Sequence, residues 1–396
     1  MTIHSLKNLN SKNFFSKPKK ESFYNSNSSF IDLKKFYTEI SKILISDFRK
    51  NNNGLKYASN RSDLLDQVIL KCFNLYKKEF EQNSNYKCSI IATGGFGRKE
   101  LAPFSDIDIL FLHTIKNEKI LKNFVKKVLN ILWDLGLKVG YATRTVKECI
   151  NFSKKKLDIC TSILESRFIV GDKKIYKNLE KEYRKKIINK FGKKFIKDIF
   201  LDREKRVLDH GDSRYLLEPN VKNGKGGMRD IQILDWIGKF FYKVNKINDL
   251  ITYKILDKYS IESFVNAKKF FWTVRTHLHI LSQRPNEQLN FEFQSVIAKK
   301  LGYKKTKVLS NVEKFMKDYF YTSKKVSDLI RIYCTLIENK ENLIPINRKL
   351  KEKEKKIKGF VIKNKKINFL KNFTLDNSNK IFEIIIIAQK NNLGIH

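Results

Sequence analysis

Residues 92–113 read ATGGFGRKELAPFSDIDILFLH, and the spacing of glycines and aspartates in this stretch decides the predicted fold. Gly94 and Gly95 follow an apolar run, and ten residues separate them from Asp106. Asp106 and Asp108 are two positions apart at the start of a second apolar run, so on a strand both carboxylates point to the same face. The stretch predicts a strand, a tight glycine turn and a second strand that carries two neighbouring negative charges.

The two neighbouring carboxylates indicate a metal site. Like charges repel, and burying them without a partner is costly, so a divalent cation resolves the conflict. Mg²⁺ favours carboxylates together with phosphate oxygens, which points to a nucleoside triphosphate. We expect Asp106 and Asp108 to bind Mg²⁺ and to be catalytic in a phosphoryl-type transfer, a reaction that depends mainly on positioning and charge neutralisation.

The glycine turn and its polar neighbours fit the same substrate. Glycine has no Cβ, so the backbone N–H groups of Gly94 and Gly95 can approach phosphate oxygens closely. Arg98 can neutralise phosphate charge, and Ser105 can donate a hydroxyl hydrogen bond. Each feature alone is common, because a glycine pair is usually a turn and two alternate aspartates are often a solvated pair. The combination is far more specific than its parts.

The chain has 396 residues and a net charge of +40. Its apolar residues make up 41% of the sequence, which is enough to build hydrophobic cores. It has no apolar run of about 18 residues or more and no signal-peptide pattern, so we expect a cytoplasmic protein without a membrane span. The cysteines form no CxxC pair and are expected to be reduced thiols. They are Cys72, Cys88, Cys149, Cys160 and Cys334.

The positive charge has two interpretations. One is a polyanion partner such as nucleic acid. The other is a composition bias of the kind that an AT-rich genome produces, since lysines are spread along the whole chain. We favour the second because no motif for nucleic-acid binding is present, so a nucleic-acid partner is not expected.

Hydrophobic periodicity divides the chain into an α/β part and a helical part. Residues 1–29 are rich in Ser, Asn and Lys and are expected to be a disordered tail. In the α/β part we expect strands at 88–93, 107–113 and 137–146 and helices at 30–50, 61–82 and 117–135. Further along we expect helices at 191–208, 229–243, 261–283, 293–301 and 307–337. A linker at 349–359, a hairpin in 360–370 and a helix at 377–392 complete the expected elements.

Residues 92–113 resemble the nucleotidyltransferase superfamily of DNA polymerase β, whose signature is G-G/S followed by D-x-D. Within it, GGFGRKELAPFSDIDILFL resembles the bacterial protein-PII uridylyltransferases. The resemblance covers roughly residues 55–340. Four further stretches carry it: WDLGLKVGYATRTVKEC (133–149), LDICTSILESRFIVGD (157–172), LEPNVKNGKGGMRDIQILDWI (217–237) and FFWTVRTHLHILSQRPNEQLNFEFQSVIAKKLGY (270–303).

This resemblance implies an α+β fold, in which a polymerase β-like nucleotidyltransferase domain is followed by a mostly α-helical domain. The expected parts are the tail 1–29, an N-terminal helix and linker 30–59, the nucleotidyltransferase domain 60–172, the helical domain 190–340, and a linker and C-terminal extension 341–396. It also implies the activity, which is Mg²⁺-dependent transfer of UMP from UTP to a tyrosine of the PII signalling protein, with release of pyrophosphate.

A second candidate motif surrounds the glycine-rich turn GKGG (224–227), which precedes an expected helix. A helix N-terminus with glycines and basic residues can bind phosphate or ribose. Alternatively, Glu218 and Arg229 pair and hold the two domains together. Both interpretations stay open for the set Glu218, Lys222, Arg229 and Asp230.

The sequence departs from the superfamily in lacking a third carboxylate on the strand 137–146. Asp158 is a tentative substitute for the general base, although a helix cap is the simpler role for it. Asp134, Glu148 and Glu165 are also available, so the general base is unassigned.

A further departure concerns the parts that follow the transferase region in this family, an HD-type hydrolase and two ACT domains. No His-Asp dipeptide occurs in the 396 residues, and His277 and His279 are two apart on a helix and so face different directions. We therefore expect neither uridylyl-removing activity nor glutamine sensing. Three alternatives remain: another nucleotide or acceptor, a non-catalytic regulator that binds PII or nucleotide, and a polyanion binder.

Overall fold

The computed structural model describes residues 30–82, 87–114, 118–210, 216–244, 249, 256–341, 355–357, 360–363, 366–369, 378–391 and 394–395. The expected tail 1–29 and most of the expected linker at 349–359 lie outside these residues. The chain divides into two compact units, residues 1–333 and 334–396. The region 60–172, predicted as one domain, lies within the first unit. The region 190–340, predicted as a separate domain, lies in the same unit up to Tyr333.

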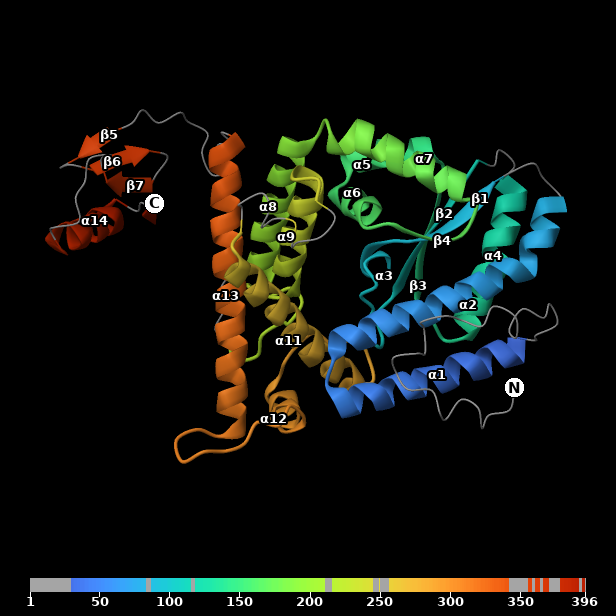
Figure 1. Ribbon diagram of the computed structural model, residues 1–396, viewed down its shortest axis with the longest axis horizontal. Helices are drawn as coiled ribbons and strands as arrows, with labels where there is room; N and C mark the ends of the chain where they lie inside the picture. The colour runs from blue at the N-terminus through green and yellow to red at the C-terminus, as the bar shows by residue number, and fades with distance from the viewer. Residues whose placement is uncertain are drawn as a thin grey trace. The chain divides into compact units, whose positions relative to one another are not determined.

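A four-stranded sheet forms the centre of the α/β part (Figure 1). Its strands are β1 (Cys88–Ala92), β2 (Ile107–His113), β3 (Val139–Arg144) and β4 (Arg167–Gly171), in the order β3-β2-β1-β4. Every residue of β1 is buried, as expected for a continuous apolar strand in the middle of a sheet. The three predicted strands are confirmed, whereas β4 was not predicted.

The strand pairing brings the two halves of the opening motif together. β1 is antiparallel to β2 and β4, and β2 is parallel to β3. The parallel pair needs a crossover, which α4 (Glu118–Asp134) supplies as predicted. In this register Asp108 of β2 lies opposite Gly140 of β3.

The sheet is covered by helices on both sides (Figure 1). α2 (Gly54–Gln82) and α4 share a core with it, in which Phe124 of α4 meets Phe111 of β2 edge to face. α1 (Phe30–Asn51) packs along α2 through residues four apart, Ile40, Leu44 and Phe48. The other side carries α5 (Val146–Lys155) and α7 (Lys173–Tyr183), with α6 (Leu157–Leu164) between them in sequence and a π-helical turn at Arg184–Ile188 after them.

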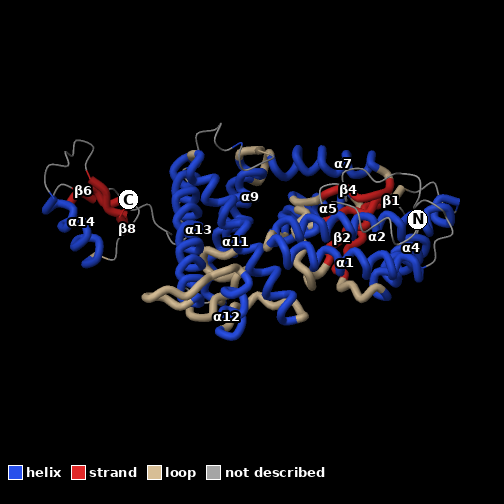
Figure 2. Tube along the Cα trace, turned by 60° about the horizontal axis from the view of Figure 1, so that its bottom comes forward, coloured by secondary structure: helices blue, strands red, loops and turns tan. Residues whose placement is uncertain are grey.

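The helical part of the first unit is drawn in blue beside the sheet in Figure 2. It contains α8 (Gly192–Asp209), α9 (Met228–Phe241), α11 (Lys258–Ser282), α12 (Phe291–Lys300) and the part of α13 (Asn311–Glu341) up to Tyr333, close to the predicted helices. Phe195 of α8 stacks on Phe240 of α9 with ring centroids 3.8 Å apart.

The second unit is a small sheet with one helix. Its strands β5 (Lys355–Ile357), β6 (Phe360–Lys363), β7 (Lys366–Phe369) and β8 (Gly394–Ile395) pair in that order. The predicted hairpin is the antiparallel pair β6–β7, and the predicted last helix is α14 (Ser378–Lys390). Phe360, Ile367, Ile384 and Ala388 form its core.

Two further expectations from composition can be compared with the structure. Within the described residues, no helix combines the length and the apolar character that crossing a membrane requires. All five cysteines are free, and four of them are buried.

The start of α2 lies directly against the backbone of α11. The helical conformation is interrupted between α1 and α2 at Asn52, whose φ is +49°. The Oδ1 atom of Asn52 accepts a hydrogen bond from His277 Nε2 at 2.8 Å. Two residues later, a Cβ on Gly54 would lie 2.3 Å from the Trp272 carbonyl oxygen. The close approach of these two helices therefore requires glycine at position 54.

Gly54→Ala should lower the free energy of unfolding by about 1–3 kcal/mol, because the added methyl group must push two helix backbones apart. Gly192→Ala is the matched control, since it adds the same methyl group at a helix start where the nearest atom, Phe241 Cδ2, would be 3.7 Å away. Urea unfolding of both variants measures the effect. Equal stability of the two variants would contradict the assigned close contact.

Candidate active site

The predicted aspartate pair lies at the start of β2. Asp106 immediately precedes the strand and Asp108 is its second residue, and both are exposed, which avoids the cost of burying them. Partial desolvation and the negative charge of Asp106 raise the pKa of Asp108. Neither carboxylate has a hydrogen bond or ion pair to another described residue. The charge of Asp106 therefore acts on Asp108, while metal binding by the pair stays a prediction.

The glycine turn is a short helical turn, α3 (Gly94–Gly97), directly beside these aspartates. Gly94 has φ of +53°, a conformation that L-residues rarely adopt, and a Cβ on it would lie 3.1 Å from Asp108 Oδ2. The first N–H groups of such a turn have no partner within it. Gly97 has a structural reason of its own, because a Cβ there would lie 2.1 Å from the Glu165 carbonyl oxygen.

Arg98, predicted to neutralise phosphate, is held in a buried ion-pair cluster. Its Nε donates to Glu100 Oε2 at 2.7 Å and its Nη1 donates to Glu165 Oε2 at 2.6 Å. Burial opposes the positive charge, but the two carboxylates raise the pKa of Arg98. Only its Nη2 faces the glycine turn, 3.8 Å from the position of a Cβ on Gly95. The contacts of Arg98 are therefore mainly structural, while its charge still lowers the pKa of Asp108.

Ser105 also has a structural contact. Its hydroxyl group donates to the Ala102 carbonyl oxygen at 3.0 Å, and its N–H bonds the same oxygen at 3.2 Å. The residue closes the turn that leads into Asp106.

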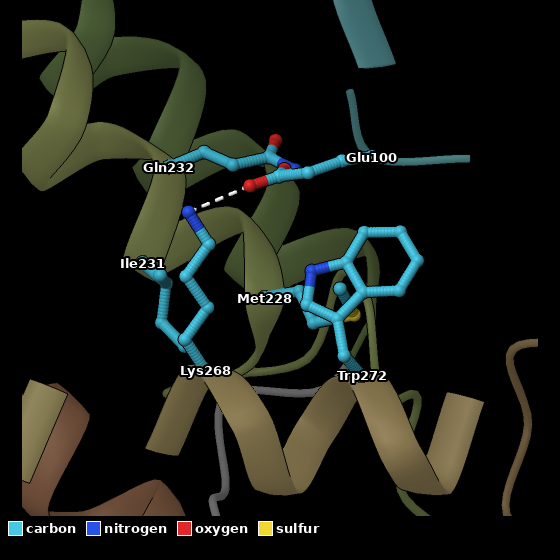
Figure 3. Close-up of a pocket in the computed structure, with 6 residues that line it drawn as sticks. All are labelled: Glu100, Met228, Ile231, Gln232, Lys268 and Trp272. Atoms are coloured by element: carbon cyan, nitrogen blue, oxygen red, sulfur yellow. Dashed lines mark ion pairs between the residues drawn. The ribbon is translucent and has the colours of Figure 1, made fainter. Parts of the chain in front are cut away.

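The ion-pair cluster continues into the helical part. Lys268 of α11 lies 2.6 Å from Glu100 Oε1 and 3.3 Å from Asp235 Oδ2, and Trp236 of α9 donates its indole N–H to Glu165. Figure 3 shows Lys268 and Glu100 facing each other beside a cavity of about 10 Å³, roughly the room that one water molecule needs. This cavity belongs to the joint between the two parts and is too small for a substrate.

Two members of the second motif are structural. Asp230 is fully buried and pairs with Arg203 and Arg206, at 3.1 and 2.9 Å, and it accepts the N–H of Gly226. Glu218 accepts the N–H of Phe291 at 2.9 Å, so it caps α12.

Three backbone N–H groups where the GKGG turn leads into α9 are already hydrogen-bonded within the motif. Gly227, Met228 and Arg229 donate to carbonyl oxygens of Gly224, Val221 and Lys222, respectively. A Cβ on Gly226 would lie 2.2 Å from the Ser323 carbonyl oxygen, so this glycine permits close contact with α13. The N-terminus of α9 is therefore engaged internally, and phosphate would have to meet side chains at this motif.

The other two members, Lys222 and Arg229, contact residues of the helical part. Lys222 Nζ lies 4.0 Å from Glu287 Oε1, and Arg229 Nη1 donates to Gln232 Oε1 at 2.8 Å. The charges of Lys222 and Arg229 lower the pKa of Asp108. Burial and the charge of Arg275 lower the pKa of Lys222, and burial and the charge of Arg98 lower the pKa of Arg229. Two cations that act on each other and on the Asp108 carboxylate suit the binding of a polyanion that carries a metal ion.

The general base stays unassigned. Glu165 is occupied by Arg98 and Trp236, and Glu148 forms a capping box with Thr145. Asp158 is exposed in the first turn of α6, but the capping role expected for it is wrong, because the N-cap is Lys156 and no side chain caps this helix. Asp134 is the exposed last residue of α4.

The donor set still fits a magnesium ion. In the described part of the chain no group of three or more His, Cys, Asp or Glu side chains is arranged to hold a metal. Two carboxylates suffice when phosphate oxygens and water complete the coordination, which is the usual arrangement for Mg²⁺.

The fold and this site define a nucleotidyltransferase, and residues 74–170 match the nucleotidyltransferase domain family. Residues 194–334 match the family described as GlnD PII-uridylyltransferase. The chain thus contains a nucleotidyltransferase domain followed by a GlnD PII-uridylyltransferase domain.

Relatives in three bacteria have the name bifunctional uridylyltransferase/uridylyl-removing enzyme. That of Azospirillum brasilense is 40% identical over 312 residues, 78% of this chain and 33% of the relative. That of Rhodospirillum rubrum is 38% identical over 301 residues, which are 75% of this chain and 32% of the relative. That of Rhodopseudomonas palustris is 35% identical over 382 residues, which are 92% of this chain and 40% of the relative. The chain thus spans about a third of the length of these relatives.

Sequence reasoning missed the residues that join the two parts. Glu100, Trp236 and Lys268 gave no signal, because a buried ion pair is recognisable only when both partners are known. The predicted divergence of the histidines is confirmed. His277 contacts Asn52, whereas His279 Nδ1 accepts the N–H of Phe104 at 3.4 Å, in the loop before Asp106.

Glu100→Gln should lower the free energy of unfolding by about 3 kcal/mol at pH 7, because it leaves two buried cations short of a partner. Burial opposes ionisation of Glu100, but Lys268 and Arg98 lower its pKa from 4.5 to about 2. A lowered pKa stabilises the folded state above about pH 4.5, and this contribution is lost as the pH falls towards about 2.

Urea unfolding at several pH values compares the free energies of unfolding of Glu100→Gln and the unmodified chain. The difference between them should shrink as the pH falls from about 4.5 to about 2. The control is Glu204→Gln, an exposed carboxylate of α8. A difference that persists unchanged at the acid end would contradict the assignment.

Proposed function

We propose that this chain transfers UMP from UTP to a tyrosine of the PII signalling protein and releases pyrophosphate. The observation that carries the proposal is the exposed pair Asp106 and Asp108 beside a glycine turn, with the charges of Lys222 and Arg229 acting on Asp108. The family match and the names of the relatives support uridylyl transfer and the PII acceptor. Cytoplasmic location is part of the proposal, supported by the five free cysteines.

In the proposed reaction, the tyrosine oxygen forms a bond to the α-phosphorus while the bond from that phosphorus to the α–β bridging oxygen breaks. The tyrosine proton leaves to solvent or to the unassigned base, and pyrophosphate takes the bonding electrons. Asp106 and Asp108 would hold Mg²⁺, which supplies charge neutralisation for the triphosphate when bound. Lys222 and Arg229 hold the β- and γ-phosphates and stabilise the charge that develops on the leaving pyrophosphate.

The direct test is incubation of the chain and purified PII with each of four labelled nucleoside triphosphates, followed by mass spectrometry of PII. We expect label from UTP, on tyrosine. Asp106→Asn or Asp108→Asn should reduce the rate by about 100-fold or more, because each removes a metal-binding charge. Both variants should fold normally, since the side chains are exposed and repel each other.

The matched control is Asp209→Asn, which neutralises an exposed aspartate at the end of α8. Normal transfer by both single variants would overturn the assigned role. Label from another nucleotide would change the substrate, and nucleotide-dependent PII binding without label would indicate a non-catalytic regulator.

We also propose that these 396 residues do not remove UMP from PII. The motivation is that they contain no His-Asp dipeptide of the kind expected in the family's hydrolase. PII labelled in advance should keep its label when incubated with this chain, with or without glutamine. Measuring released UMP gives the answer, and glutamine-stimulated release would overturn the proposal.

A further inference from the structure

We propose that Gly140 is a positioning residue for Asp108, leaving, together with Gly94, the space that the catalytic carboxylate occupies in this orientation. This inference rests on the proposed function, because it concerns the residue that would bind the metal. Gly140 is in β3, thirty-two residues after Asp108, and lies opposite it in the parallel β2–β3 pair.

The two carboxylate oxygens lie against the two glycines. A Cβ on Gly140 would be 2.7 Å from Asp108 Oδ1, a distance that Cβ atoms do not reach in real structures. A Cβ on Gly94 would be 3.1 Å from Oδ2. The carboxylate therefore occupies space on one side that a side chain at 140 would fill, and on the other side space that a side chain at 94 would restrict.

The backbone gives no other reason for glycine at position 140. Its φ is outside the left-handed region, unlike that of Gly94. It is exposed on the edge strand β3, and the nearest atom to its hypothetical Cβ outside Asp108 is the Ile107 carbonyl oxygen at 4.0 Å, an ordinary contact. Glycine normally weakens a strand, and one of its uses there is to admit a close neighbour. Here that neighbour is the Asp108 carboxylate.

The free space at position 140 matters because no described hydrogen bond would keep this carboxylate in place if an added side chain displaced it. Metal-binding carboxylates are usually held by hydrogen bonds from neighbouring groups. Asp108 has no such bond to any residue that the structure describes. A methyl group at position 140 would push Oδ1 towards the Gly94 side, changing its position relative to Asp106, and displacements of well under 1 Å matter in such sites.

The test compares the full chain with Gly140→Ala and with the control Gly192→Ala, whose added methyl group meets Phe241 Cδ2 at 3.7 Å. Mn²⁺ binding, measured by electron paramagnetic resonance without substrates, is the readout besides activity. We expect Gly140→Ala to weaken Mn²⁺ binding and to slow transfer to PII about 10- to 100-fold, the range seen when groups that orient metal ligands are lost. Unchanged binding and transfer would overturn the inference.

A double-mutant cycle covers the case in which Gly140→Ala is poorly folded. If the methyl group collides with the carboxylate, any loss of melting temperature should disappear in the Asp108→Ala background. A loss that persists there would overturn the inference. Failure of the proposed function is separate, because the unmodified chain would then bind Mn²⁺ but label no PII.

Discussion

The ion-pair cluster around Arg98 is the constraint on which the rest of the first unit depends. One guanidinium group, buried between Glu100 and Glu165, fixes the end of the glycine turn. The same two carboxylates bind Lys268 and Trp236 of the helical part. Removing one partner from such a cluster leaves a buried charge uncompensated, so its members depend on one another. The cluster therefore fixes where Lys222 and Arg229 lie relative to the aspartate pair.

This arrangement makes the candidate site composite. Asp106 and Asp108 stand at the start of β2, and Lys222 and Arg229 belong to the segment 217–237, so in the proposed function both parts contribute to binding the metal–triphosphate complex. The predicted pairing of Glu218 with Arg229 is not formed, because Glu218 accepts the N–H of Phe291 and Arg229 donates to Gln232, and phosphate binding by this motif stays a prediction. Glu218 and Asp230 have structural contacts, whereas the charges of Lys222 and Arg229 lower the pKa of Asp108. The local sequence pattern cannot show which members of the motif have structural contacts, because their partners lie elsewhere in the chain. Asp230 pairs with Arg203, and Glu218 accepts the N–H of Phe291.

Local pattern predicted most of the framework. The apolar runs of β1 and β2 and the 3.6-residue periodicity of the later helices are strong signals, and the two aspartates stand at the start of the second predicted strand. β4 was missed because its five residues are mostly half-buried and follow a short helix. Arg98 was assigned to phosphate because the sequence shows a cation next to the turn but not that Glu165, 67 positions away, occupies it. Gly140 becomes visible only with the strand register.

The exposure of Asp106 and Asp108 has a consequence for the chemistry of the proposed reaction. A folded protein can present a surface tyrosine to an open site without unfolding and without displacing part of the enzyme. The same openness admits bulk water, which is a competing nucleophile for the α-phosphorus. Productive transfer over nucleotide hydrolysis must then come from how firmly the acceptor oxygen is aligned with the phosphorus, since effective concentration from alignment can greatly exceed that of solvent. The acceptor protein would in this sense complete the enzyme.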